Sequence, residues 1–404
     1  MHQPPLVRFL DRATPPHILT LILLAGISAL SMNIFLPSLP SMTRYFDTEY
    51  RIVQLSVALY LGVNALLQVI VGPISDRYGR RPVVLWTLAI FTLASIGCVL
   101  APNIEIFLAF RMVQAVVVGG LVLSRAVVRD MVPQDQAASM IGYVTMGMSV
   151  APMLAPALGG VLDGIFGWKA SFWSLAALGA IIGYICWRDL GETMVARPVS
   201  FRAQVAEYPE LLRSRRFWGY CAAAAFASGA FFAYLGGAPF VGSEVFGLTP
   251  SALGIYFGAP AIGYMAGNYI SGRYSVRFGI NAMILWGAIL SAFGLWVSMA
   301  IFLAGHGSVG VFFGFMTFVG LGNGMVLPNA TSGMLSVRPH LAGTASGLGG
   351  AMMIGGGAAL SALAGALLTP GTGALPLIAI MAATSLLAVL SILYTIHRER
   401  SLES

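Results

Sequence analysis

The chain has 404 residues, of which 58% are hydrophobic and 9% are charged, with a formal net charge of +7. Soluble proteins carry about 25% charged residues, so this composition excludes an ordinary water-soluble fold. Anionic lipid of the inner leaflet suffices to explain the positive charge, and we expect no nucleic-acid partner.

Apolar segments of roughly 20 residues, the length that an α-helix needs to cross a bilayer, recur along the whole chain. Residues 1–16 contain several prolines and no small-residue cleavage site follows, so we expect a retained first helix and no cleaved signal peptide. The sequence therefore predicts an all-α membrane protein. Its twelve membrane-spanning helices are expected near 17–38, 52–73, 83–101, 105–127, 137–162, 170–187, 217–240, 250–272, 281–303, 309–331, 342–366 and 375–396.

The 22 lysines and arginines are unevenly distributed among the loops. Most of them lie in the two tails and in alternate loops, which fall on one side of the membrane if twelve helices span it. The positive-inside rule then places both termini in the cytoplasm. The longest polar stretch, 188–216, is predicted to be a cytoplasmic linker between an N-terminal bundle at 1–187 and a C-terminal bundle at 217–404.

The turn between the second and third helices reads Gly72-Pro-Ile-Ser-Asp76-Arg77-Tyr-Gly79-Arg80-Arg81-Pro82. Gly79 permits a tight turn, and the cations suit both a helix C-terminus and the inner leaflet. Asp76 either caps the third helix or pairs with an arginine when the cytoplasmic side is shut. In the second case the turn belongs to a conformational gate.

A fainter copy of this turn stands in the second half of the chain, where Gly272, Arg277, Gly279 and Trp286 match Gly72, Arg77, Gly79 and Trp86. A charged turn that recurs once in each half of a hydrophobic chain indicates a duplicated transporter. Two pseudo-symmetric six-helix bundles are then expected to meet around a site near the bilayer midplane.

Two predicted helices carry small residues at steps of four. The fifth has Gly147, Ala151, Ala155 and Gly159, interrupted by Pro152 and Pro156, and the eleventh has Gly343, Gly347, Ala351, Gly355 and Ala359. Helices associate in lipid through close van der Waals contact. Such stripes therefore either pack helices together permanently or form seams that slide when a transporter changes its open side.

Four stretches of the chain resemble a known family. The turn at 72–82 resembles the signature loop of the major facilitator superfamily, and Arg111-Met-Val-Gln114 resembles the motif in which drug antiporters place an arginine and a glutamine in the fourth helix. The run Ala155-Pro156-Ala-Leu-Gly159-Gly160 resembles the antiporter motif of exporters. The segments 33–40 and 232–240 are similar to the bicyclomycin-resistance (Bcr/CflA) branch of drug:proton antiporters.

This resemblance implies a monomeric secondary transporter of a bacterial inner membrane that works by alternating access and is not an enzyme. It implies the export of a small amphipathic substrate in exchange for protons, with Pro156, Gly159 and Gly160 in the moving seam. No cofactor is expected, because the sequence has no phosphate-binding loop and its three cysteines suggest neither disulfides nor a metal site.

Arg111 lies in the middle of the fourth predicted helix. A cation inside a membrane costs several kcal/mol unless it finds a partner or water, so we expect a functional residue. In the family the equivalent arginine links helices around the cavity and takes part in proton coupling. The alternative is a structural arginine whose donors are satisfied by Gln114 and backbone carbonyls.

The expected proton-coupling acid is missing, because Asn33 stands where related exporters usually have an aspartate and no carboxylate occupies a predicted helix middle. Three explanations stay open. Asp163 or Glu105 reaches the cavity from its outer rim; the substrate carries the titratable group while Arg111 faces an anion; or transport is not coupled to protons. The alternative function is that of an importer or facilitator of a small anionic metabolite, drawn to Arg111 and not coupled to protons.

Polar and aromatic side chains on apolar helices give the expected cavity lining. Tyr60, Asn64 and Gln68 recur at steps of four on the second helix, and the aromatic residues of the seventh precede an expected break at Gly236-Gly237. The candidate substrate-binding residues are Asn33, Tyr60, Asn64, Gln68, Arg111, Gln114, Phe231, Tyr234, Tyr256, Tyr264, Asn268 and Asn329.

Overall fold

The computed structural model describes residues 7–131, 140, 144, 151–194, 209–338, 342–369 and 371–403, and the regular structure in these ranges is helical. Residues 195–208 of the predicted linker and the stripe residue Gly147 lie outside these ranges, as do the side chains of Ala151 and Pro152 and the surroundings of Gly343. The helices of the first half are α1 Ile18–Asn33, the 3-10 helix η1 Leu36–Ser38, α2 Leu39–Tyr45, α3 Tyr50–Tyr78, α4 Arg80–Leu100, α5 Ile104–Gln114, the 3-10 helix η2 Ala115–Val117, α6 Val118–Met131, α8 Ala151–Phe166 and α9 Lys169–Asp189.

The second half contains α11 Arg215–Phe240, the π-helix η3 Val241–Val245, α12 Pro250–Phe257, α13 Ala259–Phe278, α14 Ile280–Leu303, α15 Val309–Val337, α16 Ala342–Leu367 and α17 Leu375–Glu403. Ten helical stretches of the described residues are long and apolar enough to cross a membrane. The short apolar helix α8 and the pair α12–α13 occupy the fifth and eighth predicted spans. The expected all-α membrane fold is therefore confirmed.

Prolines and glycines explain where the helices depart from the predicted spans. The eighth span is interrupted at Gly258, because Pro260 stands at the start of α13 and has no amide hydrogen to continue the ladder. The break predicted at Gly236-Gly237 is wrong, since α11 runs through both residues to Phe240. A Cβ atom at Gly237 would lie 2.8 Å from Leu377 Cδ1, so this glycine permits close helix packing instead of a bend.

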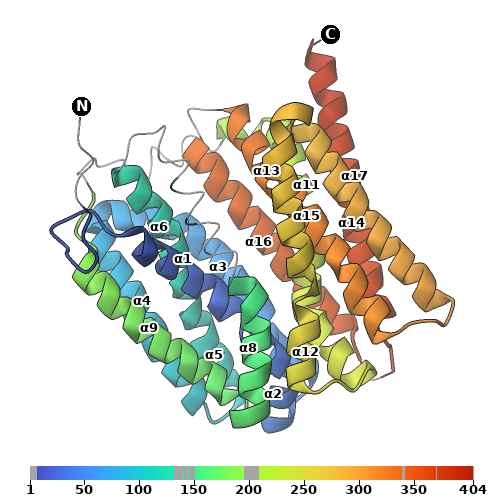
Figure 1. Cartoon of the computed structure of the whole chain (residues 1–404), viewed down its shortest axis with the longest axis horizontal. Helices are drawn as coiled ribbons and strands as arrows, with labels where there is room; N and C mark the ends of the chain where they lie inside the picture. The colour runs from blue at the N-terminus through green and yellow to red at the C-terminus, as the bar shows by residue number, and fades with distance from the viewer. Residues whose placement is uncertain are drawn as a thin grey trace.

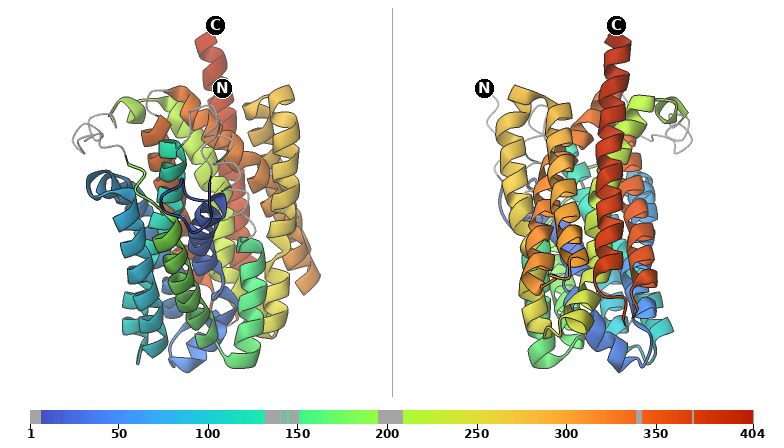
Figure 2. Two further views of the ribbon diagram at one scale, coloured as in Figure 1. Left: turned by 60° about the vertical axis from the view of Figure 1, so that its left-hand side comes forward. Right: turned by 90° about the vertical axis from the view of Figure 1, so that its right-hand side faces the viewer.

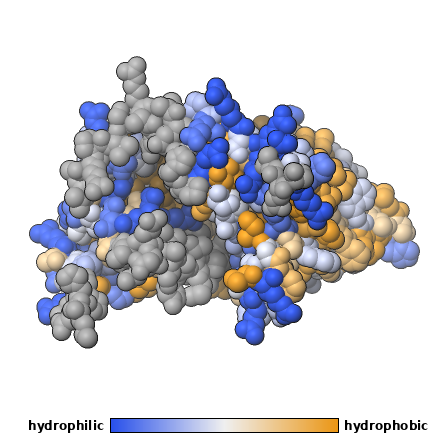
Figure 3. Space-filling model, turned by 90° about the horizontal axis from the view of Figure 1, so that it is seen from above, coloured by the Kyte–Doolittle hydropathy of each residue, from blue (hydrophilic) through white to orange (hydrophobic). Residues whose placement is uncertain are grey.

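The helices form two bundles side by side, α1–α9 and α11–α17 (Figure 1). Both termini lie at the same end of the molecule, which we call the basic end because it also carries Arg80, Arg81 and Arg277 (Figure 2). Hydrophilic residues of both bundles gather on this face, and hydrophobic residues cover the flank (Figure 3). The other end, with the loops at 46–49 and 246–249, is called the opposite end.

The turn motif and its copy have the same backbone conformation in the two bundles. Gly79 and Gly279 have φ angles of +96° and +82°, a region that favours glycine, and each ends a helix. Their amide nitrogens donate to the carbonyl oxygens of Ser75 and Ser275, both at 2.9 Å. The duplication inferred from the sequence is therefore visible as one capped turn used twice.

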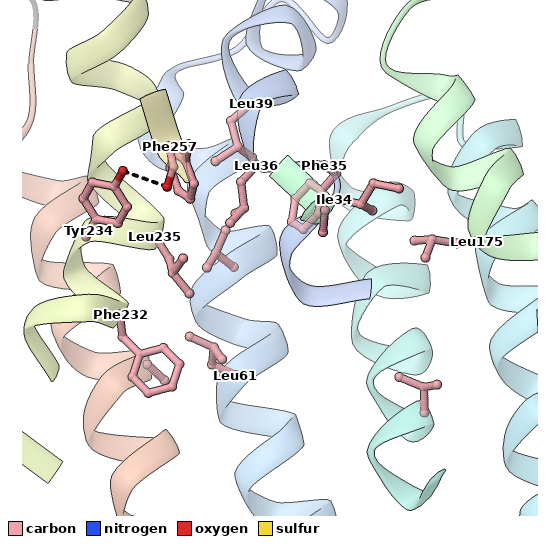
Figure 4. Packing of buried hydrophobic residues seen from close by; sticks show 14 of the residues in the cluster. Ile34, Phe35, Leu36, Leu39, Leu61, Leu175, Phe232, Tyr234, Leu235 and Phe257 are labelled. Carbon is pink, nitrogen blue, oxygen red and sulfur yellow. Dashed lines mark hydrogen bonds between the residues drawn. The ribbon is translucent and has the colours of Figure 1, made fainter. Parts of the chain in front are cut away.

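The buried apolar residues of the two bundles join into one cluster toward the opposite end. Leu61 of α3 lies toward Phe232 and Leu235 of α11 in this cluster (Figure 4). At the basic end the second bundle has a separate cluster around Phe217, Tyr220 and Met334. Among the described residues, the two bundles therefore share one core, and the second bundle has a further core of its own near the basic end.

Candidate functional site

Arg111 is 1% exposed and lies inside the first bundle, where α5 meets α1, α3 and α4. Its Nη2 donates to the Ser31 carbonyl oxygen at 2.9 Å, and its Nη1 donates to Ser31 Oγ at 3.2 Å and to Gln114 Oε1. Its Nε donates to the Ser56 carbonyl oxygen at 3.4 Å. The guanidinium therefore uses most of its donors on neutral oxygens.

Two aromatic rings complete the surroundings of this guanidinium. Its Cζ lies 3.9 Å from the centroid of the Tyr60 ring and 4.3 Å from that of Phe35. No carboxylate of the described residues lies within 4 Å of Arg111. Since ring faces and dipoles stabilise a cation without neutralising it, the site keeps a net positive charge.

Gln114 fixes the far side of this network. It is fully buried at the end of α5, and its Nε2 donates to Ser95 Oγ of α4 at 2.7 Å. The chain then tightens into η2, so the α-helical ladder is interrupted directly after Gln114. Arg111 thus donates to Gln114 and to two backbone carbonyls, which are the partners named in the structural alternative, and its role in transport stays a prediction.

The candidate residues of the first bundle fall into two groups. Tyr60 is fully buried beside Arg111, and its hydroxyl lies 3.4 Å from Ser31 Oγ. Asn64 accepts a hydrogen bond from Gln68 Nε2 at 3.1 Å, so these two side chains form the polar stripe expected on the second helix. Asn33 is fully buried; its Nδ2 donates to the Ala29 carbonyl oxygen at 2.7 Å, and its Oδ1 accepts no hydrogen bond from the described residues.

The candidate residues of the second bundle do not gather at one place. Tyr234 is buried between α11, α12 and α15 and donates to the Phe257 carbonyl oxygen at 3.1 Å (Figure 4), and its ring stacks on that of Phe231. Tyr256 is 42% exposed and packs on Phe313.

Amides of α13 and α15 bond within their own bundle. Asn268 donates to the Tyr264 carbonyl oxygen at 2.8 Å. Asn329 is buried and donates to Ser271 Oγ at 2.8 Å. The roles of all these residues in binding stay predictions.

The two candidate acids lie near the opposite end and differ in their surroundings. Glu105 is exposed in the first turn of α5. Asp163 is 9% exposed, and its Oδ2 accepts a hydrogen bond from Ser41 Oγ at 2.8 Å. Ser41 also lines a cavity of about 190 Å³ between the bundles, together with Arg44 and Glu244. Asp163 is therefore the candidate acid that neighbours space between the two halves.

The gate motif at the basic end bonds within the first half of the chain. Arg80 pairs with Asp76 at 2.5 Å and with Asp130 of α6 at 3.0 Å, while Arg77 is exposed over the Tyr78 ring. Asp76 does not cap α4. Glu192, which follows α9, accepts from the Arg80 and Arg81 amides at 2.9 and 3.2 Å instead.

Arg81 fastens this turn to the end of α9. Its Nε donates to the Leu190 carbonyl oxygen at 2.9 Å, and its Nη2 donates to that of Trp187 at 3.1 Å. These carbonyls belong to the negative end of a helix, where a cation is favoured. Gly79 leaves room for the Glu192 carboxylate beside this turn, because a Cβ atom on residue 79 would lie 2.5 Å from Glu192 Oε2.

The two halves are tightly joined near the opposite end. A Cβ atom at Gly254 of α12 would lie 2.5 Å from the Pro156 carbonyl oxygen of α8, and one at Gly160 would collide with the Pro250 carbonyl oxygen. Gly159 in turn touches the backbone of Ile34 within the first half. The small residues of the predicted exporter motif therefore allow backbone-to-backbone contact along this seam.

Hydrogen bonds reinforce the seam from α3. Tyr50 donates through its hydroxyl to the Gly236 carbonyl oxygen at 2.7 Å. Gln54 Nε2 donates to the carbonyl oxygen and Oγ of Ser361 in α16, at 2.6 and 2.8 Å. We refer to these contacts, with those of α8 and α12, as the opposite-end seam.

Three glycines near the basic end have no such neighbours. Cβ atoms placed on Gly72 of α3, Gly272 of α13 or Gly347 of α16 would meet no atom within 4 Å. The ion pairs of the described residues at this end also stay within one half or join the second bundle to residue 210. The close contacts between the bundles that involve described residues are thus concentrated at the opposite end.

The sequence did not point to Tyr50, Gln54, Ser361 or Glu192. Gln54 carries the clearest signal, because it is one more amide on the same apolar helix and face as Gln68. Asp189 was also missed: it is fully buried and accepts from the Leu10 and His17 amides and from Thr20 Oγ1 at 2.6–2.8 Å. It fastens the N-terminal segment to α9.

Comparisons with known proteins agree with this architecture. Residues 21–362 match the family model of the Major Facilitator Superfamily. The chain is 29% identical over 379 residues to multidrug resistance protein D of Escherichia coli (strain K12), and this match covers 89% of this chain and 91% of that protein. It is 25% identical over 359 residues to the bicyclomycin resistance protein homolog of Haemophilus influenzae, covering 87% of this chain and 89% of that one.

Among solved structures, a bacterial homolog of the human lysosomal transporter Spinster, in an inward-facing and occupied conformation, superimposes with a TM-score of 0.72. That comparison covers 95% of this chain and 96% of that one at 18% sequence identity, so it supports the fold alone. The relatives by sequence support the bicyclomycin-resistance branch suggested by the motifs.

Proposed function

This chain belongs to the major facilitator superfamily, and on that premise we propose that it exports small amphipathic compounds in exchange for protons by alternating access. The basic end is then the cytoplasmic end of a transporter in a bacterial inner membrane. In the state described here that end is open and the opposite end is shut. The protein works as a monomer, and the segment 188–216 links its two bundles.

The observation that supports this proposal best is a contrast between two pairs of glycines, one pair near each end. Gly160 and Gly254 hold backbone contacts between the halves at the opposite end, while Gly72 and Gly347 face open space at the basic end. A permanent packing role does not explain glycines without neighbours. Glycines that receive a partner only when the basic end closes do explain them.

The substrate class follows from the relatives and from the residues between the halves. Multidrug resistance protein D and the bicyclomycin resistance protein homolog are named for drug resistance. Amides such as Gln68 beside apolar and aromatic walls suit a substrate of mixed polarity. We therefore infer a drug, an antibiotic or a metabolite with both polar and apolar parts.

Proton coupling rests on Arg111 and on Asp163. Arg111 keeps its charge without a carboxylate partner among the described residues, and Asp163 lies beside the cavity at the opposite end. A carboxylate in such a place can bind a proton from the outside and release it after the bundles rock. Asn33 cannot take this role, because an amide does not titrate.

One alternative is supported by the same arginine. A guanidinium balanced only by neutral groups attracts an anion, so the chain would import or facilitate a small anionic metabolite without protons. The two proposals differ in their energy source. An antiporter depends on the pH gradient, and a facilitator does not.

A transport assay in vesicles distinguishes them. Proteoliposomes with an imposed pH gradient are incubated with a fluorescent drug. Accumulation of the drug inside the vesicles is recorded before and after a protonophore collapses the gradient. Antiport predicts accumulation that stops with the protonophore and is absent in Arg111→Ala. Uptake that stops at equal inside and outside concentrations, and whose rate does not depend on the pH gradient, would support the facilitator.

A further inference from the structure

A groove runs along the second bundle between α11 and α17, on the side away from the first bundle. It has a volume of about 360 Å³, and its walls include Trp218, Gly219 and Ala222 of α11 and Leu387, Leu390 and Tyr394 of α17. Leu390 and Tyr394 are 53% and 48% exposed. In the part of the chain that the structure describes, no other helix covers α17 on this side (Figure 2).

The groove is a depression in a face that meets lipid. α17 packs against α11, α14 and α16, all in the second bundle. Gly219 lets α11 and α17 come together behind the groove, because a Cβ atom there would collide with Thr395 Oγ1. The floor is therefore made of a glycine and an alanine, and larger apolar side chains form the rims.

The end of the groove nearest the basic end carries positive charge. On α11, Arg215 precedes Trp218, Gly219 and Ala222 by one and two helical turns, so it lies on their face of the helix. On α17, Arg398 follows Tyr394 by one turn on the groove face. Two arginines from two helices thus flank the mouth of one apolar groove.

These two arginines have no carboxylate within 4 Å among the described residues, unlike their neighbours. Arg216 pairs with Glu399 at 2.5 Å, and Tyr220 donates to the same carboxylate at 2.9 Å. Glu399 also accepts a hydrogen bond from Asn281, while Arg398 donates to the neutral Ser401 Oγ at 3.4 Å, so among the described residues no carboxylate neutralises Arg215 or Arg398.

Aromatic side chains mark the same level of the membrane. The Trp218 indole is held at the groove by a hydrogen bond from Nε1 to the Leu212 carbonyl oxygen at 2.7 Å, and Tyr394 stands across from it. Tryptophan and tyrosine favour the region of the lipid headgroups. The groove is apolar, then aromatic, then cationic. In this order it is complementary to the acyl chain, the glycerol ester region and the anionic phosphate of a phospholipid.

We propose that this groove binds an anionic phospholipid of the leaflet at the basic end, with an acyl chain along Ala222 and Leu390 and the phosphate between Arg215 and Arg398. The volume lies within the range of about 300–1,000 Å³ typical of ligand sites. Basic pockets between membrane helices are suited to anionic headgroups. The site is independent of the substrate path proposed above.

Native mass spectrometry of the full chain in detergent tests the site. The protein is titrated with phosphatidylglycerol and, separately, with zwitterionic phosphatidylethanolamine of the same acyl chains. We expect tighter binding of the anionic lipid. Each surface arginine contributes about fivefold to such binding, so Arg215→Ala/Arg398→Ala is expected to weaken it on the order of twentyfold.

Two further variants test whether the lipid binds in this groove. One controls for the loss of positive charge elsewhere on the protein, and the other blocks the groove without changing its charge. Arg188→Ala/Arg273→Ala removes the same charge from exposed positions outside the groove and is expected to retain the lipid. Ala222→Phe fills the floor but keeps both arginines, and it is expected to lose the lipid. Thermal unfolding in detergent verifies each fold, and Arg215→Gln/Arg398→Gln replaces the alanine pair if that pair unfolds.

Three results would overturn the proposal. They are equal loss of phosphatidylglycerol in the two arginine pairs, equal binding of both lipids, and undiminished binding in Ala222→Phe. A dimer that forms without lipid and disappears in Ala222→Phe would assign the groove to a second copy of this chain.

Discussion

Arg111 combines complete burial with hydrogen bonds to neutral groups only. Its planar fork reaches Ser31 and Gln114 at once, and its flat face lies near the rings of Tyr60 and Phe35. Lysine keeps the charge but has neither the fork nor the flat face. A lysine at position 111 therefore tests whether transport requires only the positive charge or also the shape of the guanidinium.

We predict that Arg111→Lys lowers drug efflux more than about tenfold while the protein still folds, because several charge-assisted hydrogen bonds are lost together. Efflux of a fluorescent drug from cells, normalised to protein in the membrane, measures the effect. Arg188→Lys, at an exposed position of α9, is the matched control. Wild-type efflux by Arg111→Lys would show that charge alone is needed.

Asp163 is the second residue whose role is open to a direct test. We predict that Asp163→Asn abolishes uphill transport but leaves substrate binding intact, since the amide still accepts a hydrogen bond from Ser41 but cannot exchange a proton. Accumulation in vesicles with a pH gradient and equilibrium binding give the two readouts. Glu105→Gln, exposed in the first turn of α5, is the control. If Asp163→Asn pumps normally, Asp163 is not the coupling acid.

At the scale of elements, α3 and α16 are in contact toward the opposite end and separate toward the basic end. Gln54 bonds to Ser361, and Gly350 still faces Gln68 Oε1, but a Cβ atom on Gly72 or Gly347 would meet no atom within 4 Å. A side chain placed there is harmless in the present state and obstructs closure of the basic end.

We predict that Gly72→Leu folds with normal stability and loses transport, because the transporter stays open at the basic end. A cysteine placed at Tyr78, an exposed residue at that end, remains reactive to a maleimide whether or not substrate is added. Gly314→Leu, also in open space but near the opposite end, is expected to transport normally. Normal transport by Gly72→Leu would remove the proposed role of this glycine.

Gly160→Leu in α8 is expected to destabilise the state with the opposite end shut, whereas Gly72→Leu leaves that state unchanged. The side chain at position 160 would collide with the Pro250 carbonyl oxygen, and overpacking of this kind costs about 1–3 kcal/mol. Because this cost falls only on the state with the opposite end shut, we predict a shift toward the other state on the order of tenfold or more. A cysteine at Glu244 should then react faster than in the parent protein. An unchanged rate would mean that the opposite-end seam does not open.

Much of this architecture could be predicted from the sequence, because hydropathy and turn residues act locally. The spans, the paired turns at Gly79 and Gly279 and the contact between Arg111 and Gln114 all depend on residues close together in the chain. Pro260 likewise explains the interrupted eighth span, although the sequence pattern did not reveal it.

The remaining contacts depend on residues far apart in the sequence. Gln54 meets Ser361, and Glu192 caps the helix that begins at Arg80, only because the bundles bring those segments together. Gly236 was mistaken for a break for the same reason: its partner, the Tyr50 hydroxyl, is distant in the chain. Spacing alone does not distinguish a glycine that bends a helix from one that admits a neighbour.

At the scale of the whole molecule, the account rests on two related bundles that separate alternately at their two ends. The core that joins the two halves and the separate cluster of the second bundle near the basic end are what we expect of one of the two states. The three native cysteines are buried, which favours labelling of introduced cysteines at the surface.

Double electron–electron resonance on two spin-labelled pairs tests this claim most directly. One pair, Tyr78→Cys/Phe278→Cys, reports on the basic end, and the other, Asp47→Cys/Val245→Cys, reports on the opposite end; all four positions are exposed. On addition of substrate and a change of pH, we predict that the first distance shortens in the fraction of molecules in which the second lengthens. Distances that stay fixed at both ends, or that change in the same direction, would contradict alternating access in this chain.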